Sequence, residues 1–137
     1  MSRVQLALNV SDIDAAVDFY SKLFATEPAK RRPGYANFAI AEPPLKLVLF
    51  ENSGAAGQLN HLGIELESSE QVAQVSDRLQ QADLSVTSQT QSTCCYAMQD
   101  KVWVKAPDSA DWEVYVVLED SATFGVPQNT ESPVCCS

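Results

Sequence analysis

The chain carries little basic charge and no long hydrophobic run. Nine lysine and arginine residues stand against eighteen aspartate and glutamate residues, which gives a net charge of −9 at pH 7. Nucleic acids and anionic lipid surfaces attract positively charged proteins, so this balance argues against both as partners. No run approaches the length that a membrane span needs. The chain starts directly in apolar alternation, so we expect no signal peptide and a cytoplasmic location.

Histidine is also scarce, whereas cysteine occurs in an unusual arrangement. His61 is the single histidine, and the four cysteines form two adjacent pairs, Cys94-Cys95 and Cys135-Cys136. Thiols stay mostly reduced in the cytoplasm, and adjacent cysteines do not easily bond to each other because their ring is strained. Two thiolates can instead hold one soft atom together. The first pair therefore indicates metal, metalloid or redox chemistry, unless one cysteine is simply a small buried apolar residue.

The chain length of 137 residues suits one compact domain, and its pattern repeats. In the first half, residues 4–10 alternate like a strand. Apolar side chains from Ile13 to Phe24 then recur at helical spacing after a cap at Ser11 or Asp12. Further strands are predicted at three places: residues 29–32 (the weakest indication), 35–40 and 45–50.

The same order returns after the turn-rich residues 51–57. A strand at 60–66 precedes a helix that is capped by Ser68 or Ser69 and ends near Asp83. A short strand at 84–88 and longer ones at 97–105 and 112–118 complete the half. We predict an α+β domain, residues 1–118, with modules at about 1–52 and 58–118 and a partly mobile tail at 119–137. Two unrelated α+β stretches are the alternative.

Superposing the two halves places Gln5 against His61, and Lys46 against Glu113. Side chains alternate along strands, so Gln5, His61 and Glu113 converge if the repeat is real. An imidazole, a carboxylate and an amide oxygen suit an open Fe(II) site, and also accept Mn, Co, Ni or Zn. A protonated lysine cannot bind a metal, so three ligands are expected. Taken singly, His61 is more often a packed, hydrogen-bonded residue than a ligand. Gln5 is typical of a half-exposed strand, and Glu113 of an exposed strand position.

Three segments carry a family resemblance: Val4–Asp12, Leu59–Gly63 and Asp111–Tyr115. They resemble the vicinal oxygen chelate superfamily, also called the glyoxalase/bleomycin-resistance/dioxygenase superfamily, over residues 3–118. The resemblance implies two βαβββ modules that form an open, U-shaped mixed sheet around a metal cleft.

Within that superfamily, the chain is most similar to the ArsI-type organoarsenical carbon–arsenic lyases. The similar segments are Pro33–Ile40, Leu45–Leu49, Thr93-Cys94-Cys95 and Gln99–Val104. The cysteine pair is the specific element, because the rest is shared with cadmium-induced proteins of the same fold. The resemblance implies an Fe(II)-dependent dioxygenase that uses dioxygen to cleave the carbon–arsenic bond of trivalent organoarsenicals, such as methylarsenite or aromatic arsenicals. Arsenite is released, and the activity confers resistance.

The resemblance also assigns roles to individual residues. Gln5, His61 and Glu113 would hold the iron, and Cys94 and Cys95 would bind arsenic. Neighbours on a regular strand face opposite ways, so we expect a loop or bulge around residues 93–97 that can close over the site. The protein is expected to be a monomer or a homodimer.

Several assignments stay open at this point. The aromatic residues Tyr35, Phe38, Tyr96 and Trp103 either line a substrate pocket or, as we favour, mostly pack in the core or rim. Cys135-Cys136 is either a second arsenic-gathering site or, as we favour, has no role. The competing functions are a non-catalytic metalloid- or cadmium-binding protein and a drug-binding resistance protein, which needs neither metal nor thiols.

Overall fold

The computed structural model describes residues 2–94, 96–107 and 111–121. These residues form eight strands and two α-helices. The chain packs as two compact units, Arg3–Leu62 and a second unit that follows from Gly63. The division falls inside strand β5 (Leu59–Glu65). The predicted α+β composition is therefore confirmed, and the exact module boundaries stay a prediction.

The N-terminal unit has the predicted β-α-β-β-β order. Its elements are β1 (Arg3–Val10), α1 (Ile13–Phe24), β2 (Lys30–Arg32), β3 (Tyr35–Ile40), β4 (Leu45–Glu51) and the short 3-10 turn η1 (Ser53–Ala55). The strands are ordered β2-β3-β4-β1. Strand β1 runs parallel to β4, whereas β3 is antiparallel to both β2 and β4. The weakly indicated strand β2 thus exists, one residue shorter than predicted.

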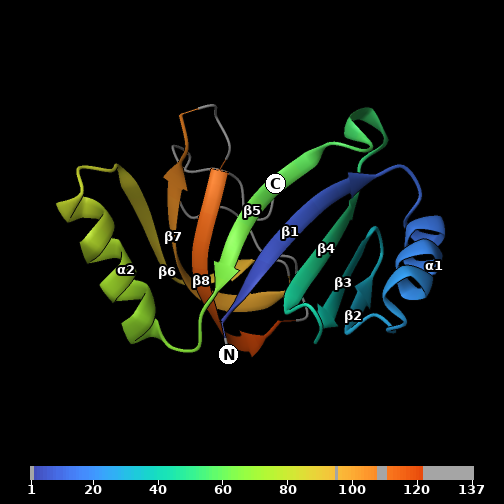
Figure 1. Cartoon of the computed structure of the whole chain (residues 1–137), viewed down its shortest axis with the longest axis horizontal. Coiled ribbons are helices and arrows are strands. Elements are labelled where there is room, and N and C mark those ends of the chain that lie inside the picture. Colours follow the sequence, from blue (N-terminus) through green and yellow to red (C-terminus); the bar gives the residue numbers. More distant parts are fainter. Residues whose placement is uncertain (1, 95, 108–110, 122–137) are drawn as a thin grey trace. The chain divides into compact units, whose positions relative to one another are not determined.

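Helix α1 begins and packs for reasons that are visible in the sequence. The Asp12 carboxylate accepts hydrogen bonds from the backbone N–H groups of Asp14 and Ala15, at 3.0 and 3.2 Å. The helix then lies beside β2–β4 (Figure 1). Its buried residues join an apolar cluster from the facing strands: Ile13, Val17, Ala36, Phe38, Ile40, Leu47 and Leu49. The helix ends at Ala25, which adopts the left-handed conformation.

The C-terminal unit contains α2 (Ser69–Gln81), β6 (Val86–Cys94), β7 (Ala97–Lys105) and β8 (Asp111–Asp120). The last three strands are ordered β8-β7-β6, and both pairs are antiparallel. The Ser68 hydroxyl caps α2 by accepting from the Gln71 N–H at 3.2 Å. Figure 1 shows α2 beside β6–β8, and its core is a smaller group of four valines at 72, 102, 114 and 116.

Two strands are longer than predicted. Strand β6 extends to Cys94, although residues 89–93 are all polar and show no apolar alternation. Hydrogen bonding to β7 extends this strand, so tertiary pairing overrides the weak local pattern. Strand β8 spans Asp111–Asp120, against a predicted strand at 112–118. Residues 122–137, including Cys135 and Cys136, lie outside the described residues. In the described part of the chain, no helix is long and apolar enough to cross a membrane.

Candidate metal centre

Strand β1 turns a polar face away from helix α1. Gln5, Ala7 and Asn9 are buried on this face, whereas the alternate residues Leu6, Leu8 and Val10 pack against the α1 cluster. The alternation along the strand has the predicted phase. The residues facing away from the helix are mostly polar, and polar groups are buried only when they find partners. This face is therefore the place to examine for a functional site in the N-terminal unit.

Gln5 and His61 lie together on that face, 56 residues apart in the chain. The Nε2 atom of Gln5 is 3.1 Å from the Nε2 atom of His61. The two side chains are 4% and 2% exposed. The other imidazole nitrogen, Nδ1, is 2.8 Å from the Oδ1 atom of Asn60, and the Phe50 ring is centred 6.4 Å from the imidazole. Two predicted ligands thus lie together in one buried, polar and aromatic environment.

The register between β1 and β4 sets Lys46 directly beside Gln5. Lys46 is half-buried, consistent with a fourth position that carries a cation rather than a ligand. Asn60 was not singled out by the sequence reasoning, although it directly precedes the only histidine. The sequence pattern does not indicate its side-chain contact with His61, which the structure shows.

Glu113, the third predicted ligand, lies in the C-terminal unit in a buried ion pair. The Lys101 Nζ atom donates to the Glu113 carboxylate at 2.8 Å, and the two side chains are 0% and 2% exposed. The Lys101 ammonium also lies 5.5 Å from the Trp103 ring centre and 5.8 Å from that of Tyr115. These rings stabilise a desolvated cation through their negative faces. The Lys101 ammonium is bonded to the Oε1 atom of the Glu113 carboxylate.

Lys101 is a second residue, after Asn60, that sequence reasoning missed. Its strand has polar residues at three consecutive positions, 99–101, so both faces carry polar side chains. The local pattern therefore does not distinguish Lys101 from an exposed lysine. Its partner Glu113 was likewise expected to be exposed if it bound no metal, yet it is almost fully buried. A buried carboxylate needs a cation or several donors, which is the argument that would have led to Lys101.

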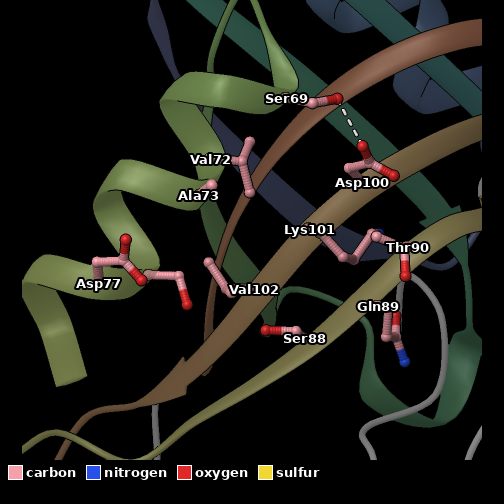
Figure 2. A pocket seen from close by; sticks show the side chains of 11 residues that line it. Ser69, Val72, Ala73, Asp77, Ser88, Gln89, Thr90, Asp100, Lys101 and Val102 are labelled. Atoms are coloured by element: carbon pink, nitrogen blue, oxygen red, sulfur yellow. Dashed lines mark hydrogen bonds between the residues drawn. The ribbon is translucent and has the colours of Figure 1, made fainter.

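A cavity lies between α2, β6 and β7, and Lys101 is among the residues that line it. Figure 2 shows Asp100 bonded to Ser69 of α2, and the Ser69 hydroxyl donates to the carboxylate at 2.5 Å. The cavity between α2, β6 and β7 has a volume of about 200 Å³ and is lined in part by Val72, Ser76 and Val102. Asp100 also accepts from the Gln91 N–H at 2.7 Å. The carboxylate of Asp100 is thus already used structurally, and the cavity lies on the helix side of the strand.

The thiol segment ends strand β6. Cys94 pairs with Ala97 at the start of β7, and Tyr96 has a φ of 63°. The pairing register shifts between Gln89 and Ser92, where Gln91 also has a positive φ of 48°, so a β-bulge occurs slightly before the expected place. Cys95 and the side chain of Cys94 lie outside the described residues. The direction of the two thiols therefore stays a prediction.

The aromatic residues divide between core and polar face. Phe38 is fully buried in the α1 cluster, so it belongs to the core. Tyr35 is 2% exposed, accepts a hydrogen bond from the Asn37 amide at 2.9 Å and packs on Phe50. Trp103 is buried beside Lys101. Core packing, the favoured interpretation, thus holds for Tyr35, Phe38 and Trp103, and Tyr35 and Trp103 also border buried polar groups.

Among the described residues, no three histidine, cysteine, aspartate or glutamate side chains gather into a metal-binding group. The predicted set contains one histidine and one carboxylate, and its third member is the Gln5 amide. This composition differs from the usual zinc sets, which are built from cysteine, histidine and carboxylate ligands, and it has fewer carboxylates than a usual calcium site.

Comparison with known proteins identifies the family. Residues 3–114 match the model of the Glyoxalase/Bleomycin resistance protein/Dioxygenase superfamily, and the chain belongs to this superfamily. It is 58% identical to the cadmium-induced protein CadI of Mycobacterium tuberculosis, over 99% of this chain and 93% of the relative. It is 54% identical to the trivalent organoarsenical cleaving enzyme of Thermomonospora curvata, over 100% of this chain and 89% of that one.

Solved structures agree on the fold. The Mn(II)-bound glyoxalase from Novosphingobium aromaticivorans superposes with a TM-score of 0.61 at 19% identity, over 93% of this chain and 44% of that one. The predicted fold class, an α+β protein with an open mixed sheet, is thereby confirmed. The predicted family is confirmed as well. The two close relatives are almost equally similar, so identity by itself does not separate a cadmium-induced protein from a carbon–arsenic lyase.

Proposed function

We propose that this protein is an Fe(II)-dependent dioxygenase that cleaves the carbon–arsenic bond of trivalent organoarsenicals. The observation that carries the proposal is the buried contact between Gln5 and His61. A binding protein that relied on thiols alone would need no imidazole paired with an amide in its interior. The 54% identity to a trivalent organoarsenical cleaving enzyme supports the same activity.

The residues fit an iron ion with nitrogen and oxygen ligands. His61 Nδ1 lies against the Asn60 oxygen, which leaves Nε2 as the coordinating nitrogen. Gln5 reaches that same nitrogen, and rotation of its amide presents Oε1 instead of Nε2. The repeat predicts that Glu113 completes the set. The bound ion would supply an open position where dioxygen is activated.

The thiols would select the oxidation state of the substrate. A trivalent organoarsenical carries one carbon and two exchangeable hydroxyl groups, and thiolates of Cys94 and Cys95 would replace both hydroxyls with release of two water molecules. The overall reaction is CH3As(OH)2 + O2 → As(OH)3 + CH2O for methylarsenite. Both oxygen atoms are used and carbon is oxidised, so the balance needs no external reductant. A pentavalent arsenical does not readily form the stable dithiolate and is expected to fail.

Sequestration without turnover is the second candidate, favoured by the 58% identity to a cadmium-induced protein. It uses the same thiols but leaves Gln5 and His61 without a role. The two candidates therefore differ in whether product forms and in whether dioxygen is consumed.

The test loads the full chain with Fe(II) without oxygen and then adds methylarsenite and air. We expect one arsenite and one formaldehyde per dioxygen consumed, measured by arsenic speciation and an oxygen electrode. Cys94→Ser and Cys95→Ser are each expected to lower turnover by at least about 100-fold while iron still binds, because one thiolate cannot form the chelate. His61→Ala is expected to abolish iron binding.

The second cysteine pair provides a matched control. The double variant Cys135→Ser/Cys136→Ser removes two thiols, one more than either single variant, and is expected to keep wild-type turnover. Stoichiometric arsenic binding with no arsenite formed would overturn the enzyme in favour of sequestration. Full activity in Cys94→Ser would refute the dithiolate role, and unchanged iron binding in His61→Ala would refute the ligand assignment.

A further inference from the structure

We infer that Asn60 and Asn9 are positioning residues that fix which nitrogen of His61 carries the proton. The three side chains form a hydrogen-bonded chain within the N-terminal unit. Asn60 Nδ2 donates to Asn9 Oδ1 at 3.0 Å, and Asn60 Oδ1 lies 2.8 Å from His61 Nδ1. An amide oxygen is an acceptor only, so the imidazole must donate from Nδ1. The neutral ring then keeps its lone pair on Nε2.

Asn9, the first residue of this hydrogen-bonded row, is held in place by backbone hydrogen bonds. The Asn9 N–H donates to the Gln58 carbonyl at 3.0 Å, and the Asn9 carbonyl accepts from the Gly57 N–H at 2.8 Å. The Asn9 side chain is 5% exposed, so water has little access to compete for its oxygen. Because the Asn60 amide nitrogen donates to Asn9, the Asn60 amide oxygen faces His61.

Gln5 independently agrees with the same tautomer. Its nitrogen, which is a donor only, lies 3.1 Å from His61 Nε2, so Nε2 must be the acceptor. Two neighbours on opposite sides of the ring thus impose one arrangement. The lone pair faces Gln5, the predicted fellow ligand, before any ion arrives. These hydrogen bonds therefore hold the imidazole in the tautomer that coordinates through Nε2. No free energy is needed to move the proton to the other nitrogen when the ion binds.

The acceptor is a neutral amide rather than the carboxylate that often supports a metal-bound histidine. A carboxylate raises the basicity of the ring, whereas an amide orients it with less added negative charge. The metal-related part of this inference rests on the proposed function, but the tautomer itself does not.

The test is direct because His61 is the only histidine in the chain. A long-range ¹H–¹⁵N spectrum of the metal-free, histidine-labelled protein contains a single imidazole. At about pH 8.5, where an ordinary imidazole is neutral, we expect a protonated Nδ1 and an unprotonated Nε2. Asn60→Ala is expected to give a mixture of tautomers. Asn60→Asp keeps an oxygen acceptor and is expected to restore the protonated Nδ1.

Metal affinity gives a second readout. Titration with Co(II) in a calorimeter is expected to show affinity about 10–100-fold lower in Asn60→Ala than in the wild type, with most of it recovered in Asn60→Asp. Asn37→Ala is the matched control. Asn37 is also a buried asparagine of this unit, but its amide donates to Tyr35, so its loss is expected to leave the tautomer of His61 unchanged.

The outcomes separate the inference from the proposed function. A protonated Nε2 in the wild type, or an unchanged spectrum in a folded Asn60→Ala variant, would overturn the inference. If Asn60→Ala does not fold, Asn60→Asp and the wild type still decide it, since loss of the protonated Nδ1 in Asn60→Asp also overturns it. The expected tautomer combined with absent turnover would refute the function and leave the inference standing.

Discussion

The two units bury polar groups on their sheets in different ways. In the N-terminal unit the buried polar side chains are neutral: Gln5, Asn9, Asn37 and His61. Gln5 contacts His61, Asn60 links His61 to Asn9, and Asn37 donates to the Tyr35 hydroxyl. The C-terminal unit also buries neutral polar side chains, but it adds two opposite charges, Lys101 and Glu113, with the Lys101 ammonium near two aromatic rings. Modules with similar strand and helix patterns thus carry different interiors.

In the proposed metal site, the two modules would contribute different kinds of group. Neutral donors lose less solvation on burial than ions do, so the N-terminal module can hold an imidazole and an amide ready without a counter-ion. The C-terminal module would supply negative charge, which is paired with Lys101 in this structure. In the proposed enzyme, the incoming cation would share the Glu113 carboxylate with Lys101.

The helix-facing sides of the two units differ as well. The N-terminal cluster contains seven buried residues, including Phe38 and Leu49, whereas the C-terminal cluster contains four valines. Larger side chains remove more apolar area from water. We therefore expect the stability of the N-terminal unit to come mainly from its apolar core. The stability of the C-terminal unit is expected to depend more strongly on its internal ion pair.

The largest expected effect comes from breaking the buried ion pair. Lys101→Met leaves the Glu113 carboxylate buried without its cation, and the free energy of unfolding of the metal-free protein is expected to fall by about 3–5 kcal/mol. Urea denaturation measures this change. The matched control is Lys105→Met, which removes an ion pair to Asp111 between the same two strands, at 3.7 Å and with the lysine 67% exposed. It is expected to cost at most about 1 kcal/mol.

A double variant sharpens the result. Lys101→Met/Glu113→Leu removes both charges and is expected to recover most of the lost stability, because the cost lies in the unpaired carboxylate. Equal losses for Lys101→Met and Lys105→Met would contradict the claim that the buried pair matters more.

The second effect concerns the N-terminal core. Leu49 is fully buried on β4, so Leu49→Ala is expected to lower the free energy of unfolding by about 2–5 kcal/mol through lost burial and a cavity. Leu23→Ala makes the same change on α1 at a residue that is 58% exposed, and is expected to stay within about 0.5 kcal/mol. Thermal and urea unfolding would both report the difference. A Leu23 effect as large as that of Leu49 would mean that the exposed face of α1 is covered in solution.

The smallest effect compares the two helix caps. Asp12 accepts from two backbone N–H groups and adds negative charge at the positive end of α1, whereas the Ser68 side chain accepts from one at the start of α2. Asp12→Ala is expected to cost about 1–2 kcal/mol and Ser68→Ala about 0.5–1 kcal/mol. Circular dichroism during urea unfolding measures both. The reverse order would show that the caps are ranked by tertiary context and not by their own hydrogen bonds.

Much of the fold follows from local patterns. The alternation in residues 4–10 and the helical spacing from Ile13 to Phe24 predicted β1 and α1 within one residue. The prediction failed at β6, because Gln89 to Thr93 has no apolar alternation and becomes a strand only by pairing with β7. Apolar alternation in the sequence indicates which side chains are buried. A polar strand that is stabilised by pairing with a neighbouring strand shows no such alternation.

The candidate site was predictable in part. The repeat suggested that Gln5 and His61 correspond, and they lie in contact. Lys101 and Asn60 were not foreseen, since each owes its place to partners 12 or more residues away, Glu113 and Asn9. A hydrogen-bonded partner that is distant in sequence has no fixed spacing by which a pattern could find it.

The sequence by itself determined the family, the order of strands and helices, and the kinds of donor atoms available: one imidazole, adjacent thiols and an excess of carboxylates. Tertiary structure alone decided how those donors are used. It placed an asparagine oxygen against one side of His61 and an amide against the other, and it paired Glu113 with a buried lysine. The physical reason is that hydrogen bonds and ion pairs act over a few ångströms in space, whereas sequence periodicity records only which side of a strand or helix each residue occupies.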